Sequence, residues 1–143
     1  MSDFDPVAVN EFNRGVIDEF RTNEGQVGGL FQGAPMLLLT STGAKTGRRH
    51  TTPVVYTTDG DRLVIFASKG GSPTNPAWYH NLVANPEATV ELGPDTFKVK
   101  AVVTTGEERS RLFEQQAAVM PTLAEYQQKT TRQIPVIALE RIS

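Results

Sequence analysis

The sequence predicts an α+β fold, an antiparallel β-barrel of about six strands with three flanking helices. The apolar segments are short and strand-sized, and turn residues rather than helices join most of them, while three other segments carry helix signals. A chain of 143 residues is long enough for one hydrophobic core and short for two. We therefore expect a single domain, 1–143, in which residues 1–30 form an N-terminal helix and linker and residues 31–143 form the barrel.

The first helix is expected from Asp5 and Pro6 to about residue 22. Asp5 can accept hydrogen bonds from the first free N–H groups, and proline is favoured at the first helical position. Apolar side chains then recur every three or four residues and form one stripe, which consists of Val9, Phe12, Val16 and Phe20. The glycine-rich residues 25–33 are expected to form a loop that Pro35 ends.

Six segments are expected to be strands, because they are apolar or alternate between apolar and polar residues. Asp59 and Gly60 are a strong signal for a hairpin between the second and third strands, and Gly-Pro-Asp at 93–95 separates the fourth from the fifth. The expected ranges are 36–41, 51–58, 62–68, 88–92, 96–104 and 135–142.

Two further helices are expected between these strands. Asn75 and the proline after it begin a short helix, which Asn85 and the proline after it end. Thr105 and Glu108 have the spacing of a capping box, which begins another helix that ends near residue 120. The polar residues 123–133 are expected to connect this helix to the last strand without forming a helix.

Composition excludes several kinds of site. The absence of cysteine rules out disulfides, thiolate nucleophiles and cysteine-based metal sites. His50 and His80 have no acidic neighbours at metal-ligand spacing, so no metal site is expected. No run approaches the roughly 18 to 20 apolar residues of a membrane span, and the N-terminus lacks the basic and apolar pattern of a secretory signal. We expect a cytoplasmic protein without a transmembrane segment, with peripheral membrane contact left open.

The charge is distributed unevenly along the chain. Residues 1–24 carry six acidic and two basic side chains, whereas residues 25–86 carry two acidic and five basic ones. Residues 87–143 carry eight acidic and seven basic side chains. A basic middle in a mildly acidic protein favours a small anionic ligand over a nucleic acid, which usually needs a broadly positive face. An acidic first helix beside an anionic ligand would repel it, and the sequence does not place this helix.

Residues 43–49, Gly-Ala-Lys-Thr-Gly-Arg-Arg, join two expected strands and combine glycines with three cationic side chains. Such a turn can bring backbone N–H groups and positive charge to one phosphate. It is not a nucleotide P-loop, because no glycine immediately precedes Lys45 and a strand follows in place of a helix. A solvated basic hairpin turn is the alternative.

Residues 68–71, Ser-Lys-Gly-Gly, form a second candidate just before the expected short helix. Free N–H groups and the dipole at a helix N-terminus attract anions, so this segment and the basic turn could hold the same phosphate. A linker whose glycines only reverse the chain is the alternative.

Two aromatic residues are candidates for ligand contact. Trp78 and Leu82 lie four residues apart on the short helix, which favours packing of Trp78 on the core over stacking on a ligand. Tyr126 lies in the polar connection, where it could either close over a ligand or pack its ring on the barrel.

Five motifs occur in an order and spacing that resemble a known family. They begin at Leu37 (Leu-Leu-Leu-Thr-Ser-Thr-Gly-Ala-Lys-Thr-Gly), Thr52 (Thr-Pro), Ser68 (Ser-Lys-Gly-Gly), Asn75 (Asn-Pro-Ala-Trp-Tyr-His-Asn-Leu) and Tyr126 (Tyr-Gln-Gln-Lys-Thr-Thr-Arg-Gln-Ile-Pro). The resemblance is to the deazaflavin-dependent nitroreductases of mycobacteria and related actinobacteria, over residues 30–142. It implies a split β-barrel like those of flavin reductases and pyridoxamine oxidases, with reduced coenzyme F420 as hydride donor.

The resemblance also implies site residues. Lys45, Thr46, Arg48 and the N–H groups of Ala77 and Trp78 would hold the phosphate and the oligoglutamate tail. Ser68 and Tyr126 would hydrogen-bond the substrate carbonyl, with Tyr126 or solvent as the proton source, and they are the expected catalytic residues. The full expected cofactor-binding set is Ala44, Lys45, Thr46, Arg48, His50, Thr51, Thr52, Pro53, Val54, Val55, Ala67, Ser68, Lys69, Ala77, Trp78, Tyr79 and Asn81.

Two positions depart from the family pattern. His50 stands where an arginine is common, which weakens or shifts one phosphate contact. Leu123 stands where a second tyrosine is common one turn before Tyr126. The leucine widens the apolar wall and suits planar enones, lactones and quinones better than nitroimidazoles.

The expected function is that of an F420H2-dependent oxidoreductase. It would transfer a hydride to an electron-poor conjugated substrate: an enone, an unsaturated lactone such as a coumarin or aflatoxin, a quinone or a nitro compound. The alternatives are a non-catalytic deazaflavin carrier and an FMN-dependent reductase with the same barrel. No nucleic-acid partner is expected. Spacing alone leaves monomer and homodimer open, because the stripe of the first helix could cover the barrel or a partner subunit.

Overall fold

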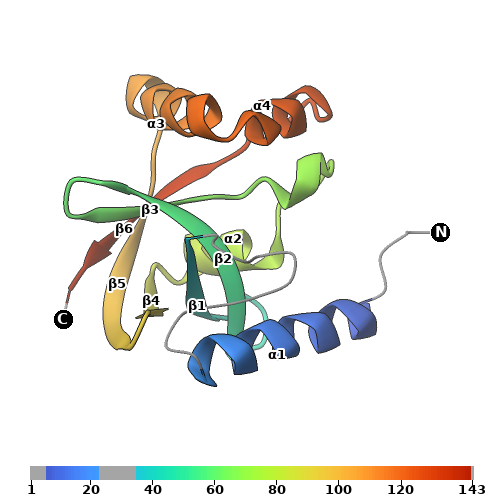
Figure 1. Ribbon diagram of the computed structural model, residues 1–143, viewed down its shortest axis with the longest axis vertical. Helices are drawn as coiled ribbons and strands as arrows, with labels where there is room; N and C mark the ends of the chain where they lie inside the picture. The colour runs from blue at the N-terminus through green and yellow to red at the C-terminus, as the bar shows by residue number, and fades with distance from the viewer. Residues whose placement is uncertain (1–5, 23–34, 143) are drawn as a thin grey trace.

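A closed barrel of six antiparallel strands forms the centre of the protein (Figure 1). The computed structural model describes residues 6–22 and 35–142. The expected cap at Asp5 and the expected loop at 25–33 lie outside these ranges. The strands are β1 (Met36–Thr42), β2 (Arg49–Asp59), β3 (Arg62–Phe66), β4 (Glu87–Leu92), β5 (Asp95–Val103) and β6 (Val136–Arg141). The helices are α1 (Pro6–Thr22), α2 (Ala77–Ala84), α3 (Gly106–Val119) and α4 (Pro121–Gln128), with a short 3-10 turn, η2 (Lys69–Gly71).

The strand order β1-β2-β3-β6-β5-β4 confirms the predicted barrel, and each expected strand lies within a few residues of its observed range. Hairpins connect β2 to β3 and β4 to β5, and the pairing of β1 with β4 closes the barrel, with Leu39 opposite Val90. Alternate side chains point inward, so Leu37, Leu39, Val90 and Val99 are fully buried in the barrel. Each such side chain contributes roughly 1.5 to 3 kcal/mol of transfer free energy.

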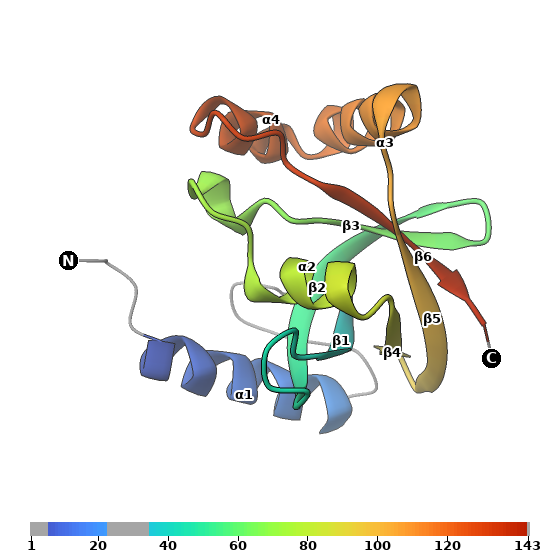
Figure 2. The ribbon, with the colours of Figure 1, turned by 180° about the vertical axis from the view of Figure 1, so that it is seen from behind.

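The helices cover the barrel from two sides, as Figures 1 and 2 both show. At one end, α3 and α4 pack over β3 and β6, with Leu112 and Leu123 buried against Val64 and Val136. At the other end, Val16 and Phe20 of α1 pack on Met36 and Leu38 of β1, as the expected apolar stripe requires. Between them lie η2 and α2. These placements leave one side of β2 facing the space between the two helical layers.

Three local expectations are wrong. The described residues form four α-helices rather than three, because residues 121–128 form α4, with Pro121 at its first position where proline is favoured. The capping box of α3 does not form, since Thr105 makes no side-chain cap hydrogen bond. Pro76 rather than Asn75 is the N-cap of α2, and the Asn75 amide oxygen accepts a hydrogen bond from Arg132 instead.

A network of charged residues joins the β2–β3 hairpin to α3. The Asp59 carboxylate lies 2.7 Å from a guanidinium nitrogen of Arg62 and 3.3 Å from one of Arg111. Arg62 also lies 3.1 Å from Glu108. Hydrogen bonds from Arg111 and then Arg62 lower the pKa of Asp59 from its ordinary value of 3.8. The network thus stabilises the folded state above that pH and loses its contribution as the pH falls through the lowered pKa.

Replacing Asp59 with asparagine is expected to lower the free energy of unfolding at pH 7 by about 1 kcal/mol or less, because the pairs are partly exposed and screened. The difference from the wild type should shrink as the pH falls from 7 to about 2, because the wild-type carboxylate loses its charge as the pH passes through its lowered pKa. Urea unfolding at both pH values measures it. An equal difference at the two pH values would show that the carboxylate charge has no part in it.

Candidate functional site

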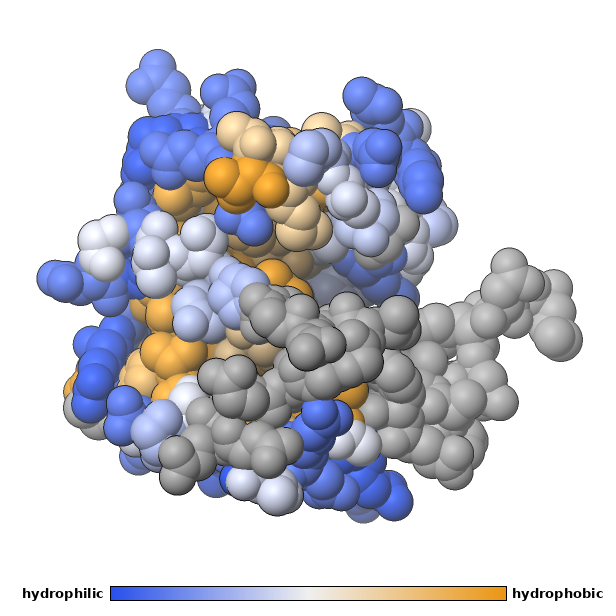
Figure 3. Space-filling model, in the orientation of Figure 1, coloured by the Kyte–Doolittle hydropathy of each residue, from blue (hydrophilic) through white to orange (hydrophobic). Residues whose placement is uncertain are grey.

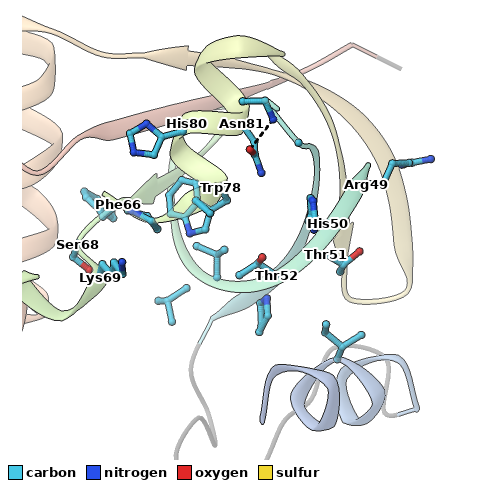
Figure 4. Close-up of a pocket in the computed structure, with 18 of the residues that line it drawn as sticks. Arg49, His50, Thr51, Thr52, Phe66, Ser68, Lys69, Trp78, His80 and Asn81 are labelled. Atoms are coloured by element: carbon cyan, nitrogen blue, oxygen red, sulfur yellow. Dashed lines mark hydrogen bonds between the residues drawn. The ribbon is translucent and has the colours of Figure 1, made fainter. Parts of the chain in front are cut away.

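A cavity of about 1350 Å³ lies along β2, between the helical layers. Its walls come from α1, the β1–β2 turn, β2, the end of β3, η2, α2, the end of α3 and α4. Figure 3 shows, on this face, hydrophobic residues gathered toward the middle of the molecule and hydrophilic residues toward its edges. Figure 4 shows the cavity with side chains of β2, α2 and the β3–η2 segment converging on it. Elements distant in sequence therefore meet around one space.

The β1–β2 turn forms a cationic end of the cavity. Gly47 adopts a φ of +71°, and the N–H groups of Gly43 and Gly47 close the turn onto Arg48 and Gly43 carbonyls. Within the part of the chain that the structure describes, the backbone N–H groups of Lys45 and Thr46 have no acceptor. Two adjacent free donors beside the Lys45 ammonium form a concavity suited to an anion.

Asn81 of α2 fixes this turn to the barrel. Its amide oxygen accepts a hydrogen bond from the Ala44 N–H at 3.0 Å, and its amide nitrogen donates to the Ser41 hydroxyl at 3.3 Å. Figure 4 shows Asn81 pointing from α2 toward the turn. The side chain is 9% exposed, so loss of the amide would leave buried polar groups unpaired. Asn81 thus sets the distance between the turn and α2.

The N-terminus of α2 borders the same cavity. Among the described residues no side chain caps this helix, and Ala77 and Trp78 line the cavity with the free N–H groups of the first turn. Trp78 is half-buried and packs on the barrel core while its ring also faces the cavity (Figure 4). The expected packing role is confirmed, and cavity contact accompanies it.

The cavity side of β2 is a strand edge. β2 pairs with β1 along residues 49–55, but its ladder with β3 begins only at Tyr56. The Tyr56 N–H donates to the Pro35 carbonyl, and by antiparallel alternation the backbone groups of Thr51 and Pro53 point away from β1. Proline is tolerated on such an edge, because no ladder N–H is required there. The edge presents the Thr51 N–H and the Thr51 and Pro53 carbonyls to the cavity.

Arg132 holds the segment that follows β3. Its guanidinium donates to the carbonyls of Ala67, Ser68 and Ser72 at 3.0, 2.8 and 2.9 Å, and to the Asn75 amide oxygen at 2.7 Å. Burial lowers the pKa of Arg132 from its ordinary value. One side chain from beyond α4 thereby fixes the loop that carries Ser68 into the cavity.

Lys69 also lies on this loop and lines the cavity. Its φ is +45°, an uncommon conformation for a residue with a side chain, and the Gly71 N–H closes the turn onto the Ser68 carbonyl. The Lys69 ammonium donates to the Thr74 hydroxyl at 3.3 Å. The two cationic turns predicted to meet, at Lys45 and Lys69, do border one cavity.

The end of the cavity beneath α3 and α4 is mainly apolar. Phe66, Met120, Leu123 and Tyr126 line it, and they pack on the cluster that joins these helices to β3 and β6. The Lys129 ammonium lies over the Tyr126 ring, 5.7 Å from its centroid. Among the described residues the Tyr126 hydroxyl has no hydrogen-bond partner, so it can serve a ligand.

Helix α1 completes the wall near the cationic turn. Arg14, Asp18 and Arg21 line the cavity, so this face is mixed rather than acidic. Arg21 makes a bidentate pair with Glu91 of β4, with N–O distances of 3.0 and 2.9 Å, and hydrogen bonding to Glu91 raises the pKa of Arg21. The pair ties α1 to the barrel.

The structure brings together most of the residues that the sequence indicates. Arg48, Ala67 and Tyr79 do not line the cavity, and their expected contacts stay predictions. Sequence reasoning missed five lining residues, of which Arg49, in the basic turn, and His80, in the motif that begins at Asn75, carried a signal. The five are Arg49, Phe66, His80, Gln116 and Met120. The predicted residues that line the cavity are Ala44, Lys45, Thr46, His50, Thr51, Thr52, Pro53, Val54, Val55, Ser68, Lys69, Ala77, Trp78, Asn81 and Tyr126.

Two further findings concern the described residues only. They contain no group of three or more histidine and acidic side chains placed to hold a metal ion. None of their helices has the length and apolar character needed to cross a bilayer.

The cavity has free N–H groups and cations at one end, and a strand edge beside apolar side chains along the rest. These features match a planar redox cofactor that carries a phosphate. The sequence model of the F420H(2)-dependent quinone reductase family matches residues 12–141. The chain belongs to this family and is an F420H2-dependent oxidoreductase with coenzyme F420 as its cofactor. The predictions of the family, the cofactor and the enzyme class are thus confirmed.

Relatives agree with this assignment. The F420H2-dependent quinone reductase Rv1261c of Mycobacterium tuberculosis is 43% identical over 128 residues, which cover 85% of each chain. A solved F420H2-dependent reductase, FDR-A, is 38% identical with a TM-score of 0.68 and covers 74% of this chain and 94% of its own. A solved structure described as a domain-swapped dimer is 34% identical, with a TM-score of 0.70, and the match covers 95% of this chain and 100% of that one. A Listeria innocua protein described as a pyridoxamine 5'-phosphate oxidase shares the fold. It is 16% identical, with a TM-score of 0.54, and the match covers 76% of this chain and 85% of that one.

Proposed function

We propose that this chain reduces quinones in the cavity along β2, with the phosphate and glutamate tail of F420 at the cationic turn. The observation that carries the proposal is the polarity of the cavity, with Lys45 and free N–H groups at one end and Leu123 and Tyr126 at the other. The anionic parts of the cofactor match the first end, and the planar rings of a quinone match the second.

The backbone of β2 supports a position for the ring. A deazaflavin has N–H and carbonyl groups on its pyrimidine edge, and Thr51 and Pro53 offer complementary backbone groups on the strand edge. Main-chain donors and acceptors on a rigid strand fix the ring plane, which a transfer between stacked rings requires.

When bound, the reduced deazaflavin supplies a hydride. The residues of this chain would orient the acceptor and control protons. The hydroxyls of Ser68 and Tyr126 would hydrogen-bond a substrate carbonyl, and Tyr126 or solvent would give a proton to the reduced oxygen. Leu123 and Met120 would exclude water from the reacting rings.

Replacing Lys45 with glutamine is expected to weaken F420 binding by about five- to tenfold at about 20 mM salt, because one charge-assisted contact worth about 1 to 1.4 kcal/mol is lost. The loss should be smaller at about 300 mM salt, where exposed charges are screened. Fluorescence titration with F420 measures both.

The matched control is Lys100→Gln, on β5 and outside the cavity lining. Its titration should follow the wild type at both salt concentrations. An equal loss in the two variants, or none in Lys45→Gln, would contradict the placement of the anionic groups at the turn. A parallel titration with FMN tests whether the site prefers the deazaflavin.

A homodimer is supported by the relative solved as a domain-swapped dimer. Sedimentation of this chain at several concentrations distinguishes it from a monomer. Cytoplasmic location, peripheral membrane contact, and reduction of enones, lactones or nitro compounds stay predictions.

A further inference from the structure

Gln116 is a buried polar residue in the apolar wall of the cavity. It lies on α3 one turn before Met120, lines the cavity and is 8% exposed. The other residues that form this wall, from Phe66 to Leu123, contribute apolar surface. A carboxamide held among such side chains costs free energy unless it has hydrogen-bond partners.

The partners of Gln116 inside the protein are weak. Its amide nitrogen lies 3.9 Å from the Met120 sulfur, a poor acceptor, and its amide oxygen has no partner among the residues that the structure describes. Every buried side-chain polar atom described in the structure that is closed off from the cavity and from solvent has a partner. The unpaired Gln116 oxygen is therefore not closed off, and Gln116 is one of the residues that line the cavity.

A second glutamine, Gln127 of α4, shows the contrast. The Gln127 amide oxygen accepts hydrogen bonds from Arg109 and from the Ile134 N–H, and its nitrogen donates to the Arg132 carbonyl at 2.7 Å. Gln127 thus joins α4 to β6 with its hydrogen-bonding capacity used. Gln116 makes no such structural link, although it is buried to a similar depth as Arg109. Its polarity is available to a ligand.

We infer that Gln116 is a specificity residue that hydrogen-bonds a carbonyl oxygen of the quinone. The inference rests on the proposed function. A p-quinone has two carbonyl oxygens on opposite sides of its ring, and Ser68 and Tyr126 are proposed to bind one. The Gln116 amide nitrogen has two N–H groups, and the one that does not face the Met120 sulfur donates to the other carbonyl oxygen. After reduction the amide oxygen can accept from the hydroquinone O–H. A carboxamide can serve both because it carries a donor and an acceptor.

Binding to the protein without cofactor tests the inference apart from turnover. Trp78 is the single tryptophan and lines the cavity, so quenching of its fluorescence reports ligand binding. Gln116→Met keeps the side-chain length and removes the amide. We expect menadione to bind about five- to tenfold more weakly, as for one hydrogen bond of about 1 to 1.4 kcal/mol, and 2-methylnaphthalene to bind unchanged. Gln115→Met, one residue away and exposed, is the control and should match the wild type.

Two further measurements separate a hydrogen-bonding role of Gln116 from a purely structural one. Gln116→Glu keeps an acceptor without an amide donor and should also bind menadione poorly, so wild-type affinity in that variant would overturn the donor role. With F420H2, the KM for menadione should rise in Gln116→Met while the KM for cyclohexenone, which has a single carbonyl, changes little. Equal weakening of menadione and 2-methylnaphthalene, or a lowered Tm with unchanged menadione affinity, would assign Gln116 a purely structural role. If the wild type neither binds nor reduces menadione, the proposed function itself fails.

Discussion

Replacing Arg132 with methionine is expected to lower the free energy of unfolding by about 2 to 4 kcal/mol and to weaken F420 binding by more than about tenfold. The methionine fills the volume but leaves four oxygen acceptors, those of Ala67, Ser68, Ser72 and Asn75, without their charged donor. Hydrogen bonds to charged groups contribute about 1.5 to 3 kcal/mol each, and part of the loss is recovered by water reaching the loop. Without these bonds the loop no longer holds Ser68 and Lys69 in the cavity.

Urea unfolding and F420 titration measure the two effects of Arg132→Met. Arg111→Met is the matched control, because that arginine is more exposed and bonds a carboxylate at 3.3 and 3.4 Å outside the cavity. It should cost under about 1 kcal/mol and leave F420 binding unchanged. Arg132→Lys keeps the charge but loses the planar fork, so it should recover only part of the loss. Full recovery by lysine would show that charge alone, rather than the four directed bonds, holds the loop.

Replacing Gly71 with alanine is expected to destabilise the fold by about 2 to 4 kcal/mol and to impair the cavity. Gly71 has a φ of +82°, and an added Cβ would lie 2.8 Å from the Tyr126 carbonyl oxygen and 3.0 Å from the Lys129 Cβ. The residue therefore combines a left-handed backbone, which costs alanine about 1 kcal/mol, with a steric clash against the backbone of α4. Relief of the clash must move η2, which carries Lys69, or move Tyr126.

The Gly60→Ala variant separates the backbone cost at Gly71 from the cost of the steric clash. Gly60 has a φ of +61° in the β2–β3 turn, but beyond its two chain neighbours no described residue has an atom within 4 Å of its added Cβ. Its alanine variant should show only the backbone cost of about 1 kcal/mol and normal F420 binding. Thermal unfolding and F420 titration of both variants provide the comparison. Equal destabilisation of the two would mean that η2 and α4 adapt to each other freely, contrary to the close approach in the structure.

Much of the fold could be predicted because its signals are local. The Asp59-Gly60 turn, the alternation around Phe97 and the Asn85 helix end each depend on neighbouring residues, and all three agree with the structure. Helix α4 was missed because its apolar contacts are few, with Leu123 as its only fully buried residue, so packing on α3 rather than periodicity stabilises it.

The candidate site can be predicted where its functional residues are adjacent in the sequence. It cannot be predicted where a residue acts through partners that are distant in the sequence. The glycines and cations around Lys45 indicate a candidate anion-binding turn from local sequence alone, with a solvated basic turn as the alternative. Gln116 carries no such mark, because a glutamine on a polar helix resembles any solvent-facing residue until the fold buries it. The role of Arg132 depends on partners about 60 residues away in the chain, which no local pattern encodes.

The incomplete pairing of β2 has a consequence for how this protein can diversify. Where β3 leaves the ladder, the side of Thr51 and Pro53 that points away from β1 faces the cavity and pairs with no strand in the part of the chain that the structure describes. A cofactor ring that docks there would complete the sheet as a surrogate strand, recognised by peptide groups that every amino-acid sequence shares. Substitutions in the helical wall could then change the range of acceptors while the docking of the cofactor stays constant.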